Sequence, residues 1–431
     1  MTQNSELIIN DRMVKIMQRT LNYVDPRLMD HGGRVAYAVY RMLKVQGKYQ
    51  GRQLQEMLLL ALLHDIGAYK TEEIERMTDF ETRYIWDHSI YGYLLLRHFS
   101  PLKAIAPAVL FHHADWTVLK EIPGLSDLCR ELSQIINIAD RADIYFENVG
   151  YKPETLSGYL RSRQGRLHDQ ELVELYLSVM PGLPRDGREK TDEQYQNLLQ
   201  LSSCCEEEIL QFVQLLVSAI DFRSYHTVTH TIITTAVSGE LARLLDLPPK
   251  ERQEIHYGAM LHDLGKVGIP AEILESPGSL SPEEMAVMRT HVDITEKILH
   301  GNVAPAVELI ALRHHEKLDG SGYPRGLTAK ALTTAQRTLA VADIISALTG
   351  ARSYKEAFPK ERTIRIIRQM ASQGKLDEEI VELAVCHLDE IMAQSDRQCR
   401  PILEAYHQIQ QEYGQLRQSF SAGVIYCPAG E

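Results

Sequence analysis

The sequence predicts an all-α protein built from two tandem helical domains, and three observations support this fold class. Apolar residues recur at helical spacing in segments such as 53–63, 131–138, 206–220 and 251–261. The sequence shows no alternating strand pattern with tight hairpin turns. A set of His and Asp residues occurs twice in the same order, which indicates an internal duplication.

Bulk properties restrict the class of protein. The chain has 431 residues, enough for two or three domains. Its apolar runs stay shorter than the roughly 20 residues that cross a bilayer, and its first residues do not resemble a secretion signal. The six cysteines form no metal-knuckle or disulfide pattern, so we expect a cytoplasmic protein. A net charge of −12 argues against DNA, RNA or an anionic membrane as partner, but allows a small anionic substrate.

Domain boundaries follow from the turn-forming residues. Pro and Gly are concentrated in the segment 181–187, and charged residues follow it. We therefore expect an N-terminal domain at 1–200 and a second domain at 201–400. A polar helix with a short tail is expected at 401–431.

Each copy of the repeated set contains a lone His, a His-Asp pair, a second lone His, a His-His pair and a distant Asp. The first copy comprises His31, His64, Asp65, His88, His112, His113 and Asp140. The second comprises His230, His262, Asp263, His291, His314, His315 and Asp343. Successive steps are about 33, 23, 24 and 27 residues in the first copy and about 32, 28, 23 and 28 in the second.

The composition of these sets predicts metal centres. Neutral imidazoles and carboxylates bind divalent transition metals, and five His with two Asp exceed the needs of one ion. We expect two ions in the second copy, with Fe, Mn, Co, Ni or Zn favoured over Mg, and a metal site in the first copy. Each adjacent pair follows an apolar run. If the pair is helical, its members lie about 100° apart, so Asp263 could lie between two ions.

Two motifs in the second copy point to a known family. Residues 262–266 read His-Asp-Leu-Gly-Lys, the HDxGK form, and residues 314–324 match the pattern HHE…DGxGYP. The stretch 341–355 is similar to the segment around the last metal ligand of that family. Over roughly residues 205–400 the chain thus resembles the HD-GYP family of the HD superfamily of metal-dependent phosphohydrolases.

The resemblance implies a function and several residue roles. Members of the family are bacterial phosphodiesterases that hydrolyse cyclic di-GMP or 3′,3′-cyclic GMP-AMP to the linear 5′-phosphorylated dinucleotide. Asp263 is then the candidate bridging ligand, and Lys266 could neutralise charge on the phosphate oxygens. Arg352 and Lys355 could hold the substrate's phosphates. Tyr323 could contact the substrate or serve only in packing.

A third ion is left open by one departure from the family pattern. Some HD-GYP enzymes have a Glu one helical turn before the first His, where it helps to hold a third metal. Here that position is His226, four residues before His230. Two imidazoles at this spacing fall on one helix face and could extend the metal site.

The first copy keeps every ligand type but lacks other parts of the motif. Ala68 takes the place of the Lys, the Gly-Tyr-Pro loop is missing, and no Arg-x-Tyr-Lys follows Asp140. It therefore resembles a general HD domain. Three interpretations remain: a structural domain braced by metal, a sensor or dimerisation module, or a second hydrolase. As a hydrolase, it could remove the 5′-phosphate from the linear product.

Two alternatives to the phosphodiesterase stay open. One is a non-catalytic receptor for a cyclic dinucleotide, and the other is a general HD nucleotide phosphohydrolase. Lys266 and the complete ligand set favour catalysis, and the Gly-Tyr-Pro loop favours the phosphodiesterase. The sequence does not decide between guanine and adenine in the substrate, and it leaves open a homo-oligomer and the upstream signal.

Overall fold

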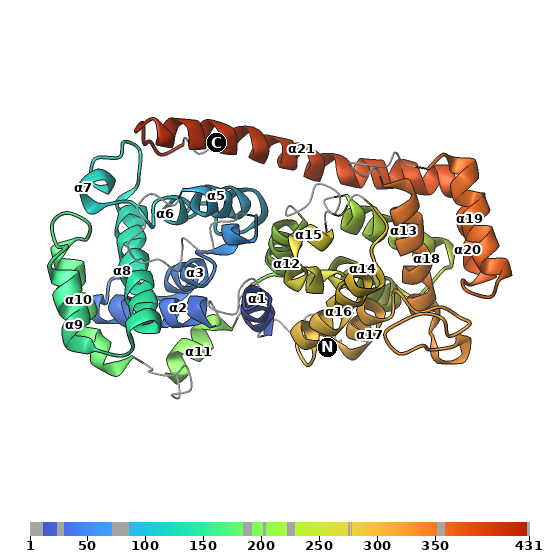
Figure 1. The fold of residues 1–431 in the computed structure, drawn as a ribbon, viewed down its shortest axis with the longest axis horizontal. Coiled ribbons are helices and arrows are strands. Elements are labelled where there is room, and N and C mark those ends of the chain that lie inside the picture. The colour runs from blue at the N-terminus through green and yellow to red at the C-terminus, as the bar shows by residue number, and fades with distance from the viewer. Residues whose placement is uncertain are drawn as a thin grey trace. The chain divides into compact units, whose positions relative to one another are not determined.

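A computed structural model describes residues 12–23, 30–70, 86–183, 192–200, 204–221, 229–274, 276, 278–350 and 358–428. The regular elements of these residues are all helices, and isolated bridges pair Gln164 with His168 and Asp319 with Thr328. The predicted all-α class is therefore confirmed (Figure 1). The four segments expected to be helical lie in α3, α8, α12 and α14, except that residue 63 follows the end of α3.

The chain forms two compact units. The C-terminal unit contains residues 1–16 and 216–407, and the N-terminal unit contains residues 17–215 and 408–431. Elements up to the end of the N-terminal repeat are α1 Met13–Leu21, α2 His31–Gln46, α3 Gly51–Leu62, η3 Ile66–Lys70, α5 Asp87–Phe99, α6 Pro107–Leu110, α7 Trp116–Leu119, α8 Asp127–Val149, α9 Pro153–Arg161, α10 Gln170–Val179, η4 Met180–Gly182 and α11 Glu193–Leu199.

The later elements begin with the helix that leads into the second repeat. They are α12 Glu206–Asp221, α13 His230–Leu244, α14 Pro249–Leu261, η6 Leu264–Gly268, α15 Ala271–Leu274, α16 Pro282–Leu299, α17 Pro305–Leu312, η7 Ala329–Ala331, α18 Thr334–Thr349, α19 Lys360–Ser372, α20 Glu378–Cys386 and α21 Leu388–Ser421. Helix α21 contributes to both units, and its division falls after His407. The boundaries expected at 200 and 400 stay predictions.

Local sequence explains where the site-bearing helices of the C-terminal unit begin. Ser281 and Glu284 form a capping box at the start of α16, and Pro282 follows at the first turn. Thr333 and Gln336 form the same device at the start of α18. These caps satisfy backbone N–H groups that would otherwise lack partners, so both helices start at defined residues.

The core of the C-terminal unit holds α13 against α18. Buried Val237 and Leu241 of α13 pack in one cluster with Val341 and Ile345 of α18. Residues of α19, α20 and the start of α21 complete this cluster. Burying such side chains contributes about 1.5–3 kcal/mol each. The two helices that supply His230 and Asp343 are therefore fixed by apolar packing.

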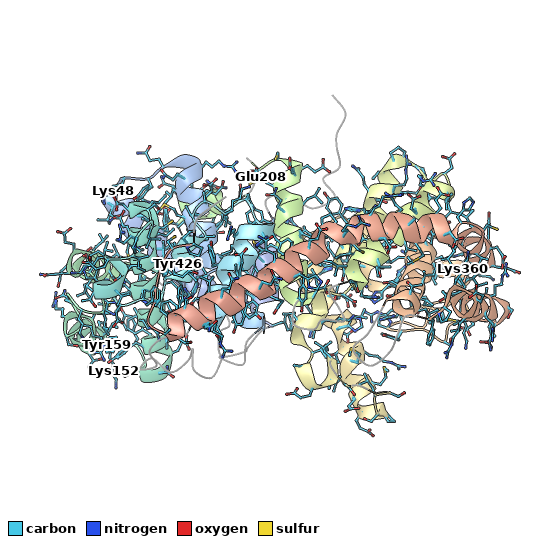
Figure 2. The ribbon with its side chains drawn as sticks, turned by 90° about the horizontal axis from the view of Figure 1, so that it is seen from above. Lys48, Lys152, Tyr159, Glu208, Lys360 and Tyr426 are labelled. Atoms are coloured by element: carbon cyan, nitrogen blue, oxygen red, sulfur yellow. The ribbon has the colours of Figure 1, made fainter. Side chains whose placement is uncertain are left out.

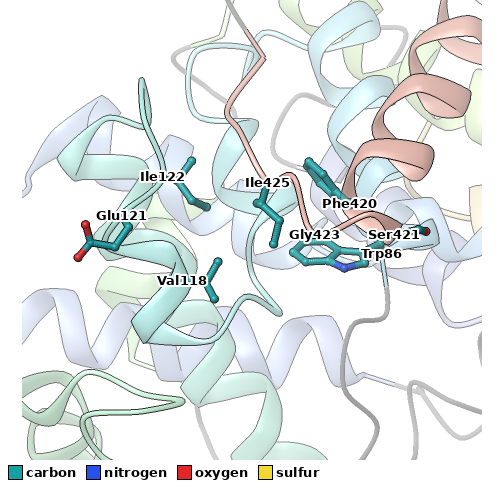
Figure 3. A pocket seen from close by; sticks show the side chains of 8 residues that line it. All are labelled: Trp86, Val118, Glu121, Ile122, Phe420, Ser421, Gly423 and Ile425. Atoms are coloured by element: carbon teal, nitrogen blue, oxygen red, sulfur yellow. The ribbon is translucent and has the colours of Figure 1, made fainter.

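The N-terminal unit is built around α2, α3 and α8. Helix α2 packs against α3, α8 and α10, and α5 packs against η3 and α6. The end of α21 belongs to this unit, where Arg97 pairs with Glu412 at 2.9 Å and Tyr91 stacks on Tyr413 at 4.1 Å. The residues that follow α21 line part of a cavity of about 700 Å³ (Figure 3). Its lining residues are Trp86, Val118, Glu121, Ile122, Phe420, Ser421, Gly423 and Ile425.

Surface charges contribute little to these arrangements. Ion pairs such as Lys48 with Glu131 and Lys360 with Asp389 have at least one exposed partner (Figure 2). Pairs of this kind contribute at most about 1 kcal/mol each. Among the helices that the structure describes, none is both long and apolar enough to span a bilayer.

Candidate metal centres

All four adjacent pairs of predicted ligands lie in the turn that follows a helix. This corrects the expectation of neighbours 100° apart within a helix, because each helix ends one or two residues before its pair. For the two His-Asp pairs the cause of this early helix end is local. A 3-10 helix, η3 or η6, begins directly after each pair. The pairs and their preceding helices are His64–Asp65 after α3, His112–His113 after α6, His262–Asp263 after α14 and His314–His315 after α17.

In the C-terminal unit the predicted ligands form two groups. His230, His262 and Asp343 present ligand atoms within 4.8 Å of one another, and so do His291, His314 and His315. His230 and Asp343 are the closest members of the first group, with 3.1 Å between Nε2 and Oδ1. The second group has 3.5 Å between the Nε2 atoms of His291 and His314.

Asp263 lies between the two groups and turns one oxygen toward each. Its Oδ2 is 3.1 Å from His262 Nε2 and 3.5 Å from His230 Nε2. Its Oδ1 is 3.5 Å from His291 Nε2 and 3.9 Å from His314 Nε2. A carboxylate in this position can bridge two cations, as the sequence predicted for Asp263.

Backbone hydrogen bonds fix the orientation of three imidazoles. The Nδ1 atoms of His262, His291 and His314 each lie 2.6–2.7 Å from the carbonyl oxygen of the residue three positions earlier. With Nδ1–H donated there, the lone pair of Nε2 faces the cluster. Within the described chain, His262 Nε2 and Asp263 Oδ1 are buried without a hydrogen-bond partner. Such a set of donors fits divalent metal ions.

The electrostatics of the cluster agree with this fit. Burial lowers the pKa of His230, but the carboxylates of Asp263 and Asp343 raise it overall to about 9. Burial raises the pKa of Asp263, yet His262 and Lys266 hold it well below its usual range. The cluster thus keeps its carboxylates ionised and attracts a cation.

Lys266 reaches the cluster from η6. Its Nζ donates a hydrogen bond to Asp263 Oδ2. Burial lowers the pKa of Lys266, but Asp263 raises it overall, so the side chain stays cationic. A Cβ on Gly265 would lie 1.8 Å from the carbonyl oxygen of His291, so only glycine lets η6 approach α16 this closely.

The Gly-Tyr-Pro loop covers one side of the second group. Buried Glu316 accepts hydrogen bonds from the backbone N–H groups of Arg325 and Leu327, both at 2.8 Å, and so holds the loop. The Tyr323 ring lies 4.6 Å from the His315 ring, and the Arg289 guanidinium lies 4.9 Å from the Tyr323 ring centre. Tyr323 therefore packs on a predicted ligand while part of it stays exposed.

Three predicted site residues lie outside the described residues. They are His226, the candidate for a third ion, and the candidate phosphate-binding residues Arg352 and Lys355. Their roles stay predictions.

The N-terminal unit repeats the cluster geometry. His31, His64 and Asp140 form one group, and His88, His112 and His113 form the other with Asp65. Asp65 again lies between the groups. Its Oδ2 is 3.4 Å from His64 Nε2 and 3.7 Å from His31 Nε2, while its Oδ1 is 3.7 Å from His88 Nε2 and 3.8 Å from His112 Nε2.

The hydrogen-bond partner of the first His in each set differs between the two units. His31 Nδ1 lies 2.7 Å from Asp143 Oδ2, and Arg34 donates to both oxygens of Asp143. The equivalent His230 instead has Ser346 as its partner, at 3.0 Å. Asp143 and Ser346 both follow the last Asp of their set by three residues. Sequence reasoning missed them, although this shared helical spacing was a usable signal.

The surroundings of His113 and His315 differ more. Arg141 Nη2 donates to His113 Nδ1 at 2.9 Å, whereas His315 Nδ1 lies 3.5 Å from Asp343 Oδ2. With Nδ1 as acceptor, neutral His113 bears its proton on Nε2, which lies 3.1 Å from His88 Nε2. His113 then presents an N–H group to its cluster, which suits a metal less well than the other six side chains.

Asp221 is a further buried acid that sequence reasoning missed. It ends α12, and burial raises its pKa to about 7, with the charges of Lys266, Asp263 and His230 nearby. Its position nine residues before His230 belongs to no motif that we identified in the sequence.

Comparison with known families agrees with both clusters. One HD domain family matches residues 30–145 and a second HD domain family matches residues 214–380. These ranges contain all the ligands of the first and second sets, respectively. Residues 30–145 and 214–380 are therefore two HD domains. The expected relation to HD-GYP phosphodiesterases is confirmed, and both HD domains of this chain are all-α.

Curated relatives of this chain are cyclic-dinucleotide phosphodiesterases. The chain is 28% identical to 3′3′-cGAMP-specific phosphodiesterase 1 of Vibrio cholerae, over 85% of this chain and 89% of the relative. It is 38% identical to a cyclic di-GMP phosphodiesterase of Thermotoga maritima, over 41% of this chain and 49% of the relative. The chain therefore spans about half of the second relative's length.

A solved structure has a similar fold. The crystal structure of a cyclic GMP-AMP-specific phosphodiesterase of Vibrio cholerae aligns with a TM-score of 0.57. The alignment covers 89% of this chain and 98% of that one, at 18% sequence identity. At this sequence identity the similarity shows only that the two chains share a fold.

Proposed function

We propose that the C-terminal HD domain is a metal-dependent phosphodiesterase that hydrolyses a cyclic dinucleotide to its linear 5′-phosphorylated form. The central observation is the position of Asp263, which turns one carboxylate oxygen toward each of two ligand groups. Homology to cyclic di-GMP and 3′3′-cGAMP phosphodiesterases supports the substrate class. Catalysis also agrees with the retained Lys266, which a receptor would not need.

The cluster has enough ligand atoms for two divalent ions, and we expect each ion to be Fe, Mn, Co, Ni or Zn. When bound, such ions would neutralise a phosphodiester and lower the pKa of water. Asp263 would hold both ions at a fixed separation. Lys266, beside it, would stabilise negative charge that develops on the non-bridging oxygens of the phosphate.

We predict the substrate contacts outside the cluster from the sequence. Arg352 and Lys355 would bind the phosphates, because cations are the partners that phosphate oxygens require. Tyr323, whose ring lies 4.6 Å from the ring of His315, would contact the substrate beside this ligand. We expect activity on cyclic di-GMP, 3′3′-cGAMP or both, and we expect the enzyme to act in the cytoplasm.

For the N-terminal HD domain we propose a 5′-nucleotidase activity on the linear product. Its ligand set has the same arrangement as the C-terminal set. However, Ala68 replaces the lysine and the Gly-Tyr-Pro loop is missing. A site that keeps its metal ligands without these parts suits a different phosphate ester, and the linear product offers a 5′-phosphomonoester.

The test uses purified, metal-loaded protein and three substrates: cyclic di-GMP, cyclic di-AMP and 3′3′-cGAMP. Chromatography separates the cyclic dinucleotide, the linear 5′-phosphorylated product and the dephosphorylated dinucleotide. We expect Asp263→Asn to abolish ring opening, and Asp65→Asn to stop only the second step. Binding of all three substrates without turnover would favour a receptor. Turnover of mononucleotides by the C-terminal domain would favour a general phosphohydrolase.

A further inference from the structure

Arg141 is a buried cation beside the N-terminal cluster with an unused donor. It follows Asp140 on α8 and is 7% exposed. Its Nη2 donates to His113 Nδ1 at 2.9 Å, and its Nε lies 3.8 Å from Asp140 Oδ2. Nη1 is buried and has no hydrogen-bond partner in the part of the chain that the structure describes. A guanidinium is always charged, so an unpaired buried donor on it is costly.

His168 is a second buried side chain with unused polar atoms. It is 3% exposed, and neither ring nitrogen has a hydrogen-bond partner among the described residues. The positive charges of Arg141 and Arg163 act on His168, and burial together with these charges lowers its pKa to about 3. The imidazole is therefore neutral and offers one N–H donor and one acceptor.

Hydrogen bonds join the segment before α10, which contains His168, to residues that follow the pair His112–His113 in the chain. Backbone N–H groups of Trp116 and Thr117 donate to the carbonyl oxygens of Leu167 and Arg166, at 3.0 and 3.1 Å. The next residue, Asp169, donates its backbone N–H to Gln134 on α8 at 3.1 Å. The segment that holds His168 is thus bonded both to the chain just after the His pair and to the helix that bears Arg141.

The C-terminal HD domain has different residues at the positions equivalent to these. Ile344 follows Asp343, where the N-terminal domain has Arg141 after Asp140, and Ile344 packs against the hydrophobic core. The chain after His315 forms the Gly-Tyr-Pro loop, where the N-terminal domain pairs residues 116–117 with 166–167. The unused donor of Arg141 and the unused ring nitrogens of His168 are therefore specific to the N-terminal site.

We propose that Arg141 and His168 bind the phosphate group of a phosphomonoester next to the N-terminal cluster. Arg141 Nη1 and a His168 ring N–H would donate to the terminal oxygens. A phosphomonoester suits this pair better than a cyclic diester, because it has three terminal oxygens and two charges rather than two oxygens and one. The proposal rests on the 5′-nucleotidase function proposed above and names residues that would give it substrate specificity.

Phosphate binding can be measured without turnover. Inorganic phosphate is titrated calorimetrically into the full-length, Mn²⁺-loaded chain that bears Asp263→Asn, so that the C-terminal cluster contributes little. Arg141→Ile introduces the residue type that the other domain has, and His168→Phe keeps the ring while removing both nitrogens. Arg166→Met, which removes an exposed cation from the same segment, is the matched control.

We expect Arg141→Ile and His168→Phe each to weaken phosphate binding by about ten- to a hundredfold, with unchanged metal content. Arg166→Met should leave the affinity within about twofold. Equal affinity in the parent and in either variant at Arg141 or His168 would overturn the proposal. If Arg141→Ile does not fold, His168→Phe alone decides.

Hydrolysis separates this proposal from the function on which it rests. The same proteins are incubated with a linear 5′-phosphorylated dinucleotide, and released phosphate is measured. If the parent binds phosphate through both residues but releases none, the binding site stands and the nucleotidase function fails. If the parent releases phosphate and Arg141→Ile does so with unchanged KM, the nucleotidase stands and the binding site is wrong.

Discussion

Lys266 donates a hydrogen bond to Asp263 through the carboxylate oxygen that also faces His230 and His262. The ammonium group therefore sits at the edge of the cluster and is not one of its ligands. Because the pKa of Lys266 is raised overall, the group stays charged throughout the neutral range.

Replacing Lys266 by Met should separate catalysis from metal binding. We expect ring opening to slow by about a hundredfold, because a donor to developing phosphate charge is lost. Bound metal, measured by elemental analysis, should stay at the parental level. Loss of metal together with activity would show that Lys266 acts only by holding Asp263 in place.

Gly265 should tolerate no side chain. A Cβ there would lie 1.8 Å from a backbone oxygen that cannot move away, so Gly265→Ala should destabilise the protein by about 3 kcal/mol or more. Gly239 on α13 is the control, because a Cβ there meets nothing within 4 Å. Gly239→Ala should raise stability by up to about 1 kcal/mol. Thermal unfolding measures both, and equal melting temperatures would contradict the packing argument.

The two equivalent residues His113 and His315 should differ in their effect on metal content. His113 accepts a hydrogen bond from Arg141 through Nδ1, whereas Nδ1 of His315 faces a carboxylate. We expect His315→Ala to remove about one metal ion per chain, and His113→Ala to remove much less. Elemental analysis of the two variants at equal protein concentration is the measurement. Equal losses would mean that Arg141 moves aside when metal binds.

Metal affinity of the C-terminal cluster should rise with pH. The pKa of His230 is raised to about 9, so its protonated form stabilises the folded, metal-free chain fully below about pH 6.5. That contribution is lost as the pH rises through 9. A metal must displace this proton, so the dissociation constant for Mn²⁺ should fall by about tenfold per unit between pH 7 and 8.5. Competition titration of the Asp65→Asn variant, whose N-terminal cluster is impaired, measures this slope, and a flat profile would refute it.

The repeated spacing of His and Asp was enough to predict which residues meet. Helical periodicity gave the all-α class, and the order of ligands in each set reappears as two groups around Asp65 and Asp263. The motif also indicated which domain has the lysine and the Gly-Tyr-Pro loop. These features depend on residues close in sequence or repeated in order, so a single chain reveals them.

Other features of the sites depend on burial and could not be predicted. The adjacent pairs lie in turns because helices α3, α6, α14 and α17 end just before them, and periodicity does not locate helix ends to a single residue. His168 is 28 residues from Asp140 and belongs to no motif. The proposal for His168 needed the structure, in which its ring is buried without a hydrogen-bond partner among the described residues.

The decisive measurement for the C-terminal cluster combines metal content with turnover in matched variants of Asp263 and Asp65. We expect Asp263→Asn to lose the ions of the C-terminal cluster and at least about a thousandfold in the rate of ring opening, while Asp65→Asn keeps both. A parental rate of cyclic-dinucleotide hydrolysis by an Asp263→Asn protein that has lost those ions would contradict this expectation.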